Sequence, residues 1–278
     1  MNLQRYNFRV PTPFYHLSLA EELIRHPDLP QKLGRLLQSA RGEFLFGNMA
    51  PDVQVVSSQP REETHFFSIP IQVSDPPAWE RLLSSYPHLA EPERLQASQA
   101  AFLAGYLCHL QADWMWIKQI FAPFFGPRCS WGTFHERLYY HNALRAYLDQ
   151  HVLPGLNLGM DACLHQVRPD GWLPFVESQD LVEWRDFLDA QLYPGAVTQT
   201  VEVFSARQGI SAPEYYALLG SEERMQREVF EHIPLEQVQN YRQSVLAENI
   251  RLLTGYLAFA LHQSDNMNKR KMPQGDQL

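Results

Sequence analysis

The sequence contains little cysteine, with Cys108, Cys129 and Cys163 as its only three thiols. An odd number of cysteines without C-x-x-C spacing predicts neither a disulfide framework nor a thiolate zinc site. Long apolar runs are also lacking, because none approaches the roughly 20 residues that a membrane-spanning helix needs. The first segment, MNLQRYNFRVPTPFYH, has no continuous apolar core of the kind found in signal peptides. These absences predict a cytoplasmic protein without a transmembrane segment.

Basic residues are outnumbered, with 23 Lys and Arg against 31 Asp and Glu, so the formal net charge is −8. This balance argues against nucleic-acid binding by the whole surface, although a local basic patch remains open. The composition is otherwise that of a globular protein, at 45% hydrophobic and 19% charged residues. A chain of 278 residues has enough material for one large or two modest domains.

No long stretch alternates between apolar and polar residues with a period of two, so no substantial sheet is expected. Helical spacing recurs instead, and the fold class predicted is an all-α multi-helix bundle. Its central element is one long helix over residues 96–125, rich in Ala, Leu, Gln and Met and first broken by Pro123. Thr12 and Pro13 are typical of a helix start. Further helices are expected over residues 28–40, 79–86, 134–152, 181–192, 214–219, 222–232 and 236–262.

Two segments interrupt this helical spacing. Residues 53–75 carry Pro60 and Pro70 and are expected to form a loop, and the Gly- and Pro-rich residues 154–174 are the only plausible internal boundary. We expect a single helical metal-binding domain over residues 1–264, followed by a disordered polar tail over residues 265–278.

The central helix carries His109 and Asp113 four residues apart, so both side chains leave the same helix face one turn apart. An imidazole and a carboxylate at this spacing can close on one metal ion. The alternative for such a pair is a polar helix face without a ligand. Here the neighbouring residues are apolar, and buried polar groups among them need partners. Gly105, one turn before His109, would leave room for another chain to pass close by.

Three more candidate ligands, His16, Asp52 and His65, lie in separate segments of the first half. Neutral imidazole together with carboxylate oxygen is the ligand set that zinc and similar divalent ions prefer. His16 could equally be an ordinary surface histidine, Asp52 a turn residue after Pro51, and His65 a loop residue bonded to the backbone. No sequence spacing links the three segments.

Four stretches in this order resemble the zinc-dependent phospholipase C family, namely FYHLSLAEELI, FGNMAPDVQ, ETHFF and AFLAGYLCHLQAD. The resemblance covers roughly residues 12–150 and implies an all-helical fold shared with the P1-type nucleases. It implies that Asp52, His65, His109 and Asp113 hold one metal ion. It also implies that His16 belongs to a neighbouring ion, which Asp113 bridges. The family completes that second site with a freed N-terminal amine, and we expect this ligand to be missing here, because fifteen residues precede His16.

The third metal site of the family is altered in this sequence. Gln119 stands where the family has a histidine, and the following His-x-x-x-Glu has two possible registers here, starting at His135 or at His141. We favour His141, because Asp149 then also falls where the family has an Asp. In this register Arg145 replaces the glutamate, and its guanidinium could bind phosphate oxygens in place of the ion.

The function predicted is that of a zinc-dependent hydrolase of phosphoesters, a phospholipase C-like phosphodiesterase in which a metal-activated water attacks phosphorus. The resemblance gives Asp52 a role as base or ligand and Arg145 a role at the phosphate. His141 is kept as a candidate metal ligand, and one or two zinc ions are expected. The substrate would be a phosphoester small molecule or a phospholipid headgroup. Two alternatives stay open: a catalytically degenerate helical metal-binding protein with a binding or structural role, and a metal-free helical interaction module.

Overall fold

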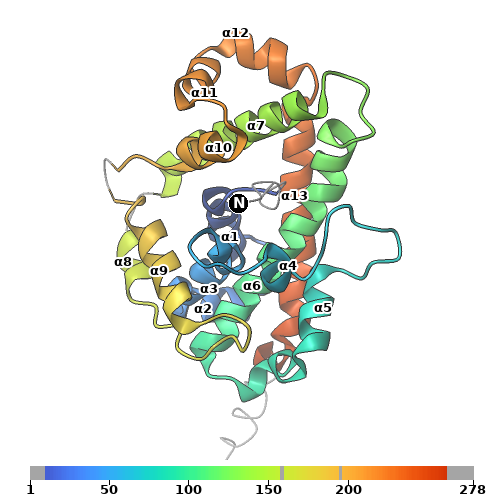
Figure 1. Ribbon diagram of the computed structural model, residues 1–278. Helices are drawn as coiled ribbons and strands as arrows, with labels where there is room; N and C mark the ends of the chain where they lie inside the picture. The colour runs from blue at the N-terminus through green and yellow to red at the C-terminus, as the bar shows by residue number, and fades with distance from the viewer. Residues whose placement is uncertain (1–9, 157–159, 194–195, 262–278) are drawn as a thin grey trace, which may run out of the picture.

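The chain folds into helices packed around one buried central helix (Figure 1). The computed structural model describes residues 10–156, 160–193 and 196–261, and these residues contain helices and no strand. The predicted all-α fold is therefore confirmed. The predicted disordered tail, residues 265–278, lies outside the described residues. None of the described helices combines the length and the apolar character that crossing a membrane requires.

The first half of the chain, as far as the end of the central helix, contains ten helical elements within the described residues. They are α1 (Pro13–Arg25), α2 (Gln31–Ser39), α3 (Arg41–Gly47), the 3-10 helix η2 (Ala50–Val55), α4 (Arg61–His65), α5 (Ala78–Ser85), the 3-10 turns η3 (Pro87–Ala90) and η4 (Pro92–Arg94), α6 (Ala97–Trp116) and the π-helical segment η5 (Ile117–Phe125).

The second half continues with helices that cover the upper and left sides of the molecule in Figure 1, and with the last helix, which runs down the right half of the view. They are α7 (Phe134–Leu156), α8 (Met160–His165), α9 (Ser178–Asp189), α10 (Thr200–Gln208), α11 (Ala212–Leu219), α12 (Glu222–Met225), the π-helical segment η6 (Gln226–Phe230) and α13 (Leu235–Tyr256).

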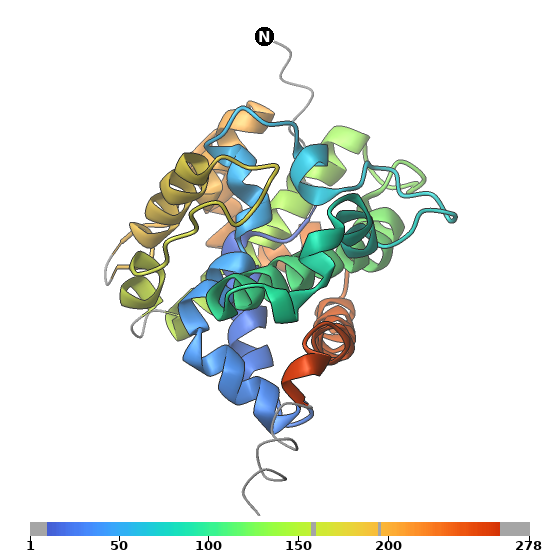
Figure 2. The ribbon, with the colours of Figure 1, turned by 90° about the horizontal axis from the view of Figure 1, so that it is seen from below.

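The central helix is α6, which packs against α3 and α13 and is buried nearly all round (Figures 1 and 2). Between Ala100 and Trp116 only Gln111 is not buried. A helix that is covered on all sides belongs to the core, and polar side chains on it must find partners there. The helix is continuous to Phe125 as expected, but regular α spacing ends at Trp116. The wider π turns that follow accommodate Pro123 inside the helix.

Two glycines let α3 and α6 approach unusually closely. A Cβ atom on Gly105 would lie 2.2 Å from the Phe44 carbonyl oxygen, and one on Gly47 would lie 2.0 Å from the Phe102 carbonyl oxygen. Real Cβ contacts do not come below 3.0 Å, so any side chain at either position would push the two helices apart. The close backbone contact expected at Gly105 is therefore present, and the segment that contacts it is α3.

Several local expectations differ from the structure: helices α3 and α8, for example, were not among those expected. The expected loop over residues 53–75 contains the short helix α4, so His65 is the last residue of a helix rather than a loop residue. The expected helix end near residue 152 lies at Leu156, because Pro154 is accommodated within the last turns of α7. No helix was expected between residues 193 and 213, yet α10 is there. Its buried apolar residues are only Val201 and Phe204, too few to give a clear stripe.

Candidate metal centre

Helix α6 contributes His109 and Asp113, and both side chains are fully buried. The Nδ1–H of His109 donates a hydrogen bond of 2.7 Å to the carbonyl oxygen of Asn48. Asn48 follows α3 directly, so the close contact of α3 with α6 also fixes this imidazole. Metal-binding histidines are typically oriented by such a bond, which leaves Nε2 free to face the ion.

Helix α4 contributes His65, which is also fully buried. The helix stops at this residue because Phe66 turns into the left-handed region, with φ of 59°. The Nδ1 of His65 lies 2.9 Å from the Thr64 hydroxyl, and the Thr64 carbonyl oxygen accepts a hydrogen bond of 2.6 Å from the Tyr106 hydroxyl on α6. These bonds fix the His65 ring with Nε2 pointing at α6.

Four donor atoms converge where α4, α6 and η2 meet. His65 Nε2 lies 3.5 Å from Asp52 Oδ1, 3.4 Å from Asp113 Oδ2 and 3.3 Å from His109 Nε2, and His109 Nε2 lies 3.6 Å from Asp113 Oδ2. Zinc bonds of 2.0–2.2 Å in a tetrahedron put its donors about 3.3–3.6 Å apart. These four distances match the donor spacing of a tetrahedral zinc ion, and the ligand atoms of Asp52, His65 and His109 all lie within 4.8 Å of one another.

His16, from the first turns of α1, lies on the other side of Asp113. Its Nε2 is 3.1 Å from Asp113 Oδ1, and its ring stacks on that of His109 with the centroids 3.8 Å apart. Its Nδ1 is buried and has no hydrogen-bond partner among the described residues. His16, His109 and Asp113 form a second group that could hold an ion, as do Asp52, His65 and His109. The residues before Val10, where the family places its extra ligand, lie outside the described part of the chain.

Sequence reasoning missed Arg61, which also contacts this centre. Its Nη2 donates a hydrogen bond of 2.6 Å to Asp113 Oδ2, and its guanidinium lies over the Phe67 ring at 4.7 Å from the centroid. Arg61 precedes His65 by four residues, so the spacing that singled out His109 and Asp113 applied here as well. Its positive charge offsets one of the two carboxylates at the centre.

Burial and neighbouring charges set the protonation of these groups. Burial and the nearby Arg61 charge lower the pKa of His65 to about 4, so this imidazole is neutral at physiological pH, as ligation requires. Burial alone would raise the pKa of Asp52, but the hydrogen bond from His65 and the charges of His109 and His65 hold that pKa at about 2. Asp52 is therefore an ionised carboxylate.

In the part of the chain that the structure describes, no cluster of donors surrounds the expected third site. His141 is buried, but its Nε2 accepts a hydrogen bond of 3.0 Å from the Trp116 indole, and it belongs to neither of the groups that could hold an ion in the described residues. Gln119 and His135 are exposed. Arg145, by contrast, is buried and lines a cavity together with Asp52. The structure thus brings His16, Asp52, His65, His109 and Asp113 together and leaves His141 apart.

A helical fold that gathers two carboxylates and three imidazoles at one buried point is characteristic of a metalloprotein of the all-α class. Comparison with known families agrees: the sequence model of the family described as zinc dependent phospholipase C matches residues 15–116. The match contains all five residues of the buried centre and ends before His141 and Arg145. Neither the comparison with curated proteins nor that with solved structures gives a significant match.

The predicted resemblance is thus confirmed over the segment that carries the donors. Zinc is the metal that both the family and the donor set support. Ligation by the individual residues stays a prediction.

Proposed function

We propose that this protein hydrolyses phosphoesters with the help of a zinc ion held by Asp52, His65, His109 and Asp113. The observation that carries the proposal is the set of donor distances of 3.3–3.6 Å in a buried centre that adjoins a cavity. Asp52 belongs to both, because it is a member of the donor set and also lines the cavity. A phosphate in the cavity would therefore lie beside the metal centre.

Bound zinc supplies a Lewis acid that lowers the pKa of a water molecule and polarises a phosphoryl oxygen. Asp52 is ionised and can either ligate through one oxygen or accept a proton from the attacking water. Arg145 faces the same cavity and can donate two parallel hydrogen bonds to phosphate oxygens. Arg61 donates a hydrogen bond of 2.6 Å to Asp113 and offsets part of its negative charge.

We infer that one zinc ion is bound tightly and that a second ion, if taken up, is bound weakly. The group of His16, His109 and Asp113 shares His109 with the group of Asp52, His65 and His109, and the proposed first ion already uses Asp113 as well, so only His16 is left for a second ion. Arg61 and the first zinc ion together already outweigh the negative charge of the two carboxylates, so a second dication would be repelled.

We also retain a single domain over residues 1–264 as a proposal. The support is a cavity whose lining comes from both halves of the chain, from the segment leading into α1 and from α9 and α10.

The test is the hydrolysis of bis(p-nitrophenyl) phosphate by the zinc-loaded protein, with and without a chelator. We expect turnover that the chelator abolishes and added zinc restores. Asp113→Asn should lower turnover by more than the roughly 10–100-fold typical of losing a residue that only orients a ligand. His88→Ala, at an exposed histidine that belongs to neither donor group, is the matched control and should leave turnover unchanged.

A helical metal-binding protein without catalysis is the second candidate. It is supported by the third-site position of the family, where His141 bonds to Trp116 and Arg145 stands in place of a carboxylate. Zinc bound at one per chain without turnover of mono- or diesters would favour this candidate. The absence of zinc would overturn both.

A further inference from the structure

A cavity lies beside the metal centre, and only part of its lining comes from the residues that match the family model. It encloses about 480 Å³ of space not filled by atoms, including its opening to solvent. Its walls come from η2, the start of α1, α7, α9 and α10. Helices α7, α9 and α10 lie beyond residue 116, where the family match ends.

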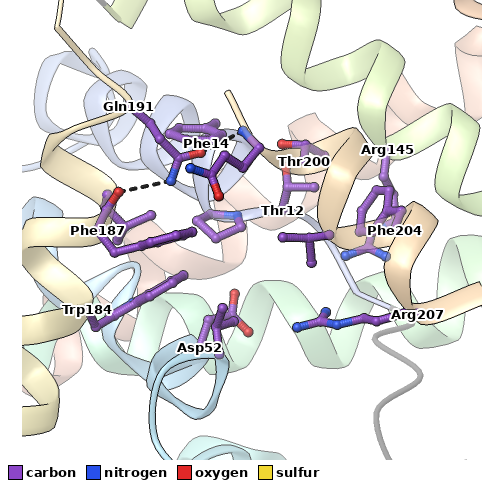
Figure 3. A pocket seen from close by; sticks show the side chains of 15 residues that line it. Thr12, Phe14, Asp52, Arg145, Trp184, Phe187, Gln191, Thr200, Phe204 and Arg207 are labelled. Carbon is purple, nitrogen blue, oxygen red and sulfur yellow. Dashed lines mark hydrogen bonds between the residues drawn. The ribbon is translucent and has the colours of Figure 1, made fainter. Parts of the chain in front are cut away.

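One end of this cavity is cationic (Figure 3). Arg145 from α7 and Arg207 from α10 both point into it, towards Asp52. Burial lowers the pKa of each guanidinium to about 10, against the opposing effect of Asp52, so both remain charged at neutral pH. The Arg145 guanidinium lies over the Phe204 ring at 4.4 Å from the centroid, and its Nη1 donates a hydrogen bond of 2.9 Å to Asn142 Oδ1. This end therefore offers two charged guanidinium groups.

The opposite end is aromatic. Trp184 and Phe187, one turn apart on α9, stack with their ring centroids 5.5 Å apart and their planes at 16°. The Trp184 indole N–H donates a hydrogen bond of 2.7 Å to the carbonyl oxygen of Met49, which fixes the ring. Figure 3 shows these two side chains across the cavity from Arg145 and Arg207. A preformed aromatic wall favours an apolar, flat group over a strongly hydrated one.

We propose that this cavity binds a phosphoester whose esterified group is apolar and ring-sized. The phosphate would lie between Arg145 and Arg207, next to Asp52, and the apolar group would lie against Trp184 and Phe187. This inference rests on the proposed function for the position of the scissile phosphate, and it adds the substrate class. Cationic headgroups are disfavoured, because among the residues lining the cavity Asp52 is the only carboxylate and the two arginines already face it.

The test is a binding experiment, so that it does not depend on turnover. Titration calorimetry compares phenylphosphonate, which cannot be hydrolysed at its P–C bond, with methylphosphonate and with phenol, on the zinc-loaded protein and again after chelation. We expect phenylphosphonate to bind at least about tenfold more tightly than methylphosphonate in both states, because the ring is removed from water. We expect phenol to bind weakly.

Two variants separate the ends of the cavity. Arg207→Gln should weaken phenylphosphonate at least about tenfold, the usual effect of losing a charged hydrogen-bond partner, and leave phenol unchanged. Phe187→Ala should reduce the preference for phenyl over methyl and leave methylphosphonate unchanged. Arg251→Gln, at an arginine whose side chain is 72% exposed on α13, is the matched control and should change nothing. Thermal unfolding of each variant verifies that it is folded.

Equal binding of phenyl- and methylphosphonate to the unaltered protein overturns the inference, whatever the variants do. So does an Arg207→Gln protein with unchanged affinity for phenylphosphonate. Ring preference and Arg207 dependence without zinc uptake or turnover would overturn only the proposed function, whereas turnover without ring preference would overturn only this inference.

Discussion

Replacing Gly105 by alanine tests whether the close contact of α3 and α6 supports the metal centre. The added Cβ would lie 2.2 Å from the Phe44 carbonyl oxygen and 2.9 Å from the Asn48 nitrogen, whereas ordinary contacts begin at 3.4 Å. Helix α3 must therefore withdraw by about 1 Å, and overpacking of this kind typically costs 1–3 kcal/mol of the free energy of unfolding. The same movement pulls the Asn48 carbonyl away from His109 Nδ1. Zinc affinity should fall about 10–100-fold, as when a ligand-orienting bond is lost.

Urea unfolding followed by circular dichroism measures the first effect, and competition with a zinc chelator measures the second. Gly255→Ala is the matched control: no atom lies within 4 Å of its added Cβ, and Gly255 is near the end of α13. Alanine should there stabilise the helix by up to about 1 kcal/mol. A Gly105→Ala protein as stable as the unaltered one, with unchanged zinc affinity, would show that the packing argument is wrong.

Two further substitutions concern charged groups near the centre. Burial raises the pKa of Asp149 to about 6, from 3.8 when unfolded, so its contribution to stability is full below pH 4 and is lost as the pH rises through 6. Thermal unfolding at pH 4.5 and 7.5 should therefore show Asp149→Asn gaining about 2 kcal/mol relative to the unaltered protein between the two values, and no gain would refute the pKa shift. Arg61→Gln removes a positive charge beside Asp113 and should tighten zinc binding about tenfold in chelator competition. Weaker binding would mean that Arg61 supports the centre instead.

The sequence predicted the helical class and the central helix because both depend on local spacing. His109 and Asp113 were recognisable for the same reason, since one turn of helix separates them. Bringing Asp52 and His65 to the same point depends on how η2 and α4 pack, and no local spacing encodes that contact. The family resemblance supplied it.

The cavity could not be predicted from local sequence patterns either, because it also depends on tertiary packing. Arg207 lies on α10, whose few buried apolar residues gave no helical signal, and Trp184 and Phe187 look like ordinary packing residues of α9. Only the tertiary arrangement shows that these side chains face Arg145 and Asp52 across one space. Arg61 could have been found, because it precedes His65 by one helical turn.

The most direct test of the central claim is the zinc content of the purified protein, measured by elemental analysis after loading with excess zinc and desalting. The proposed centre predicts one zinc ion per chain in the unaltered protein and in His88→Ala, and none in Asp113→Asn. No retained zinc in the unaltered protein, or three ions per chain, would contradict it.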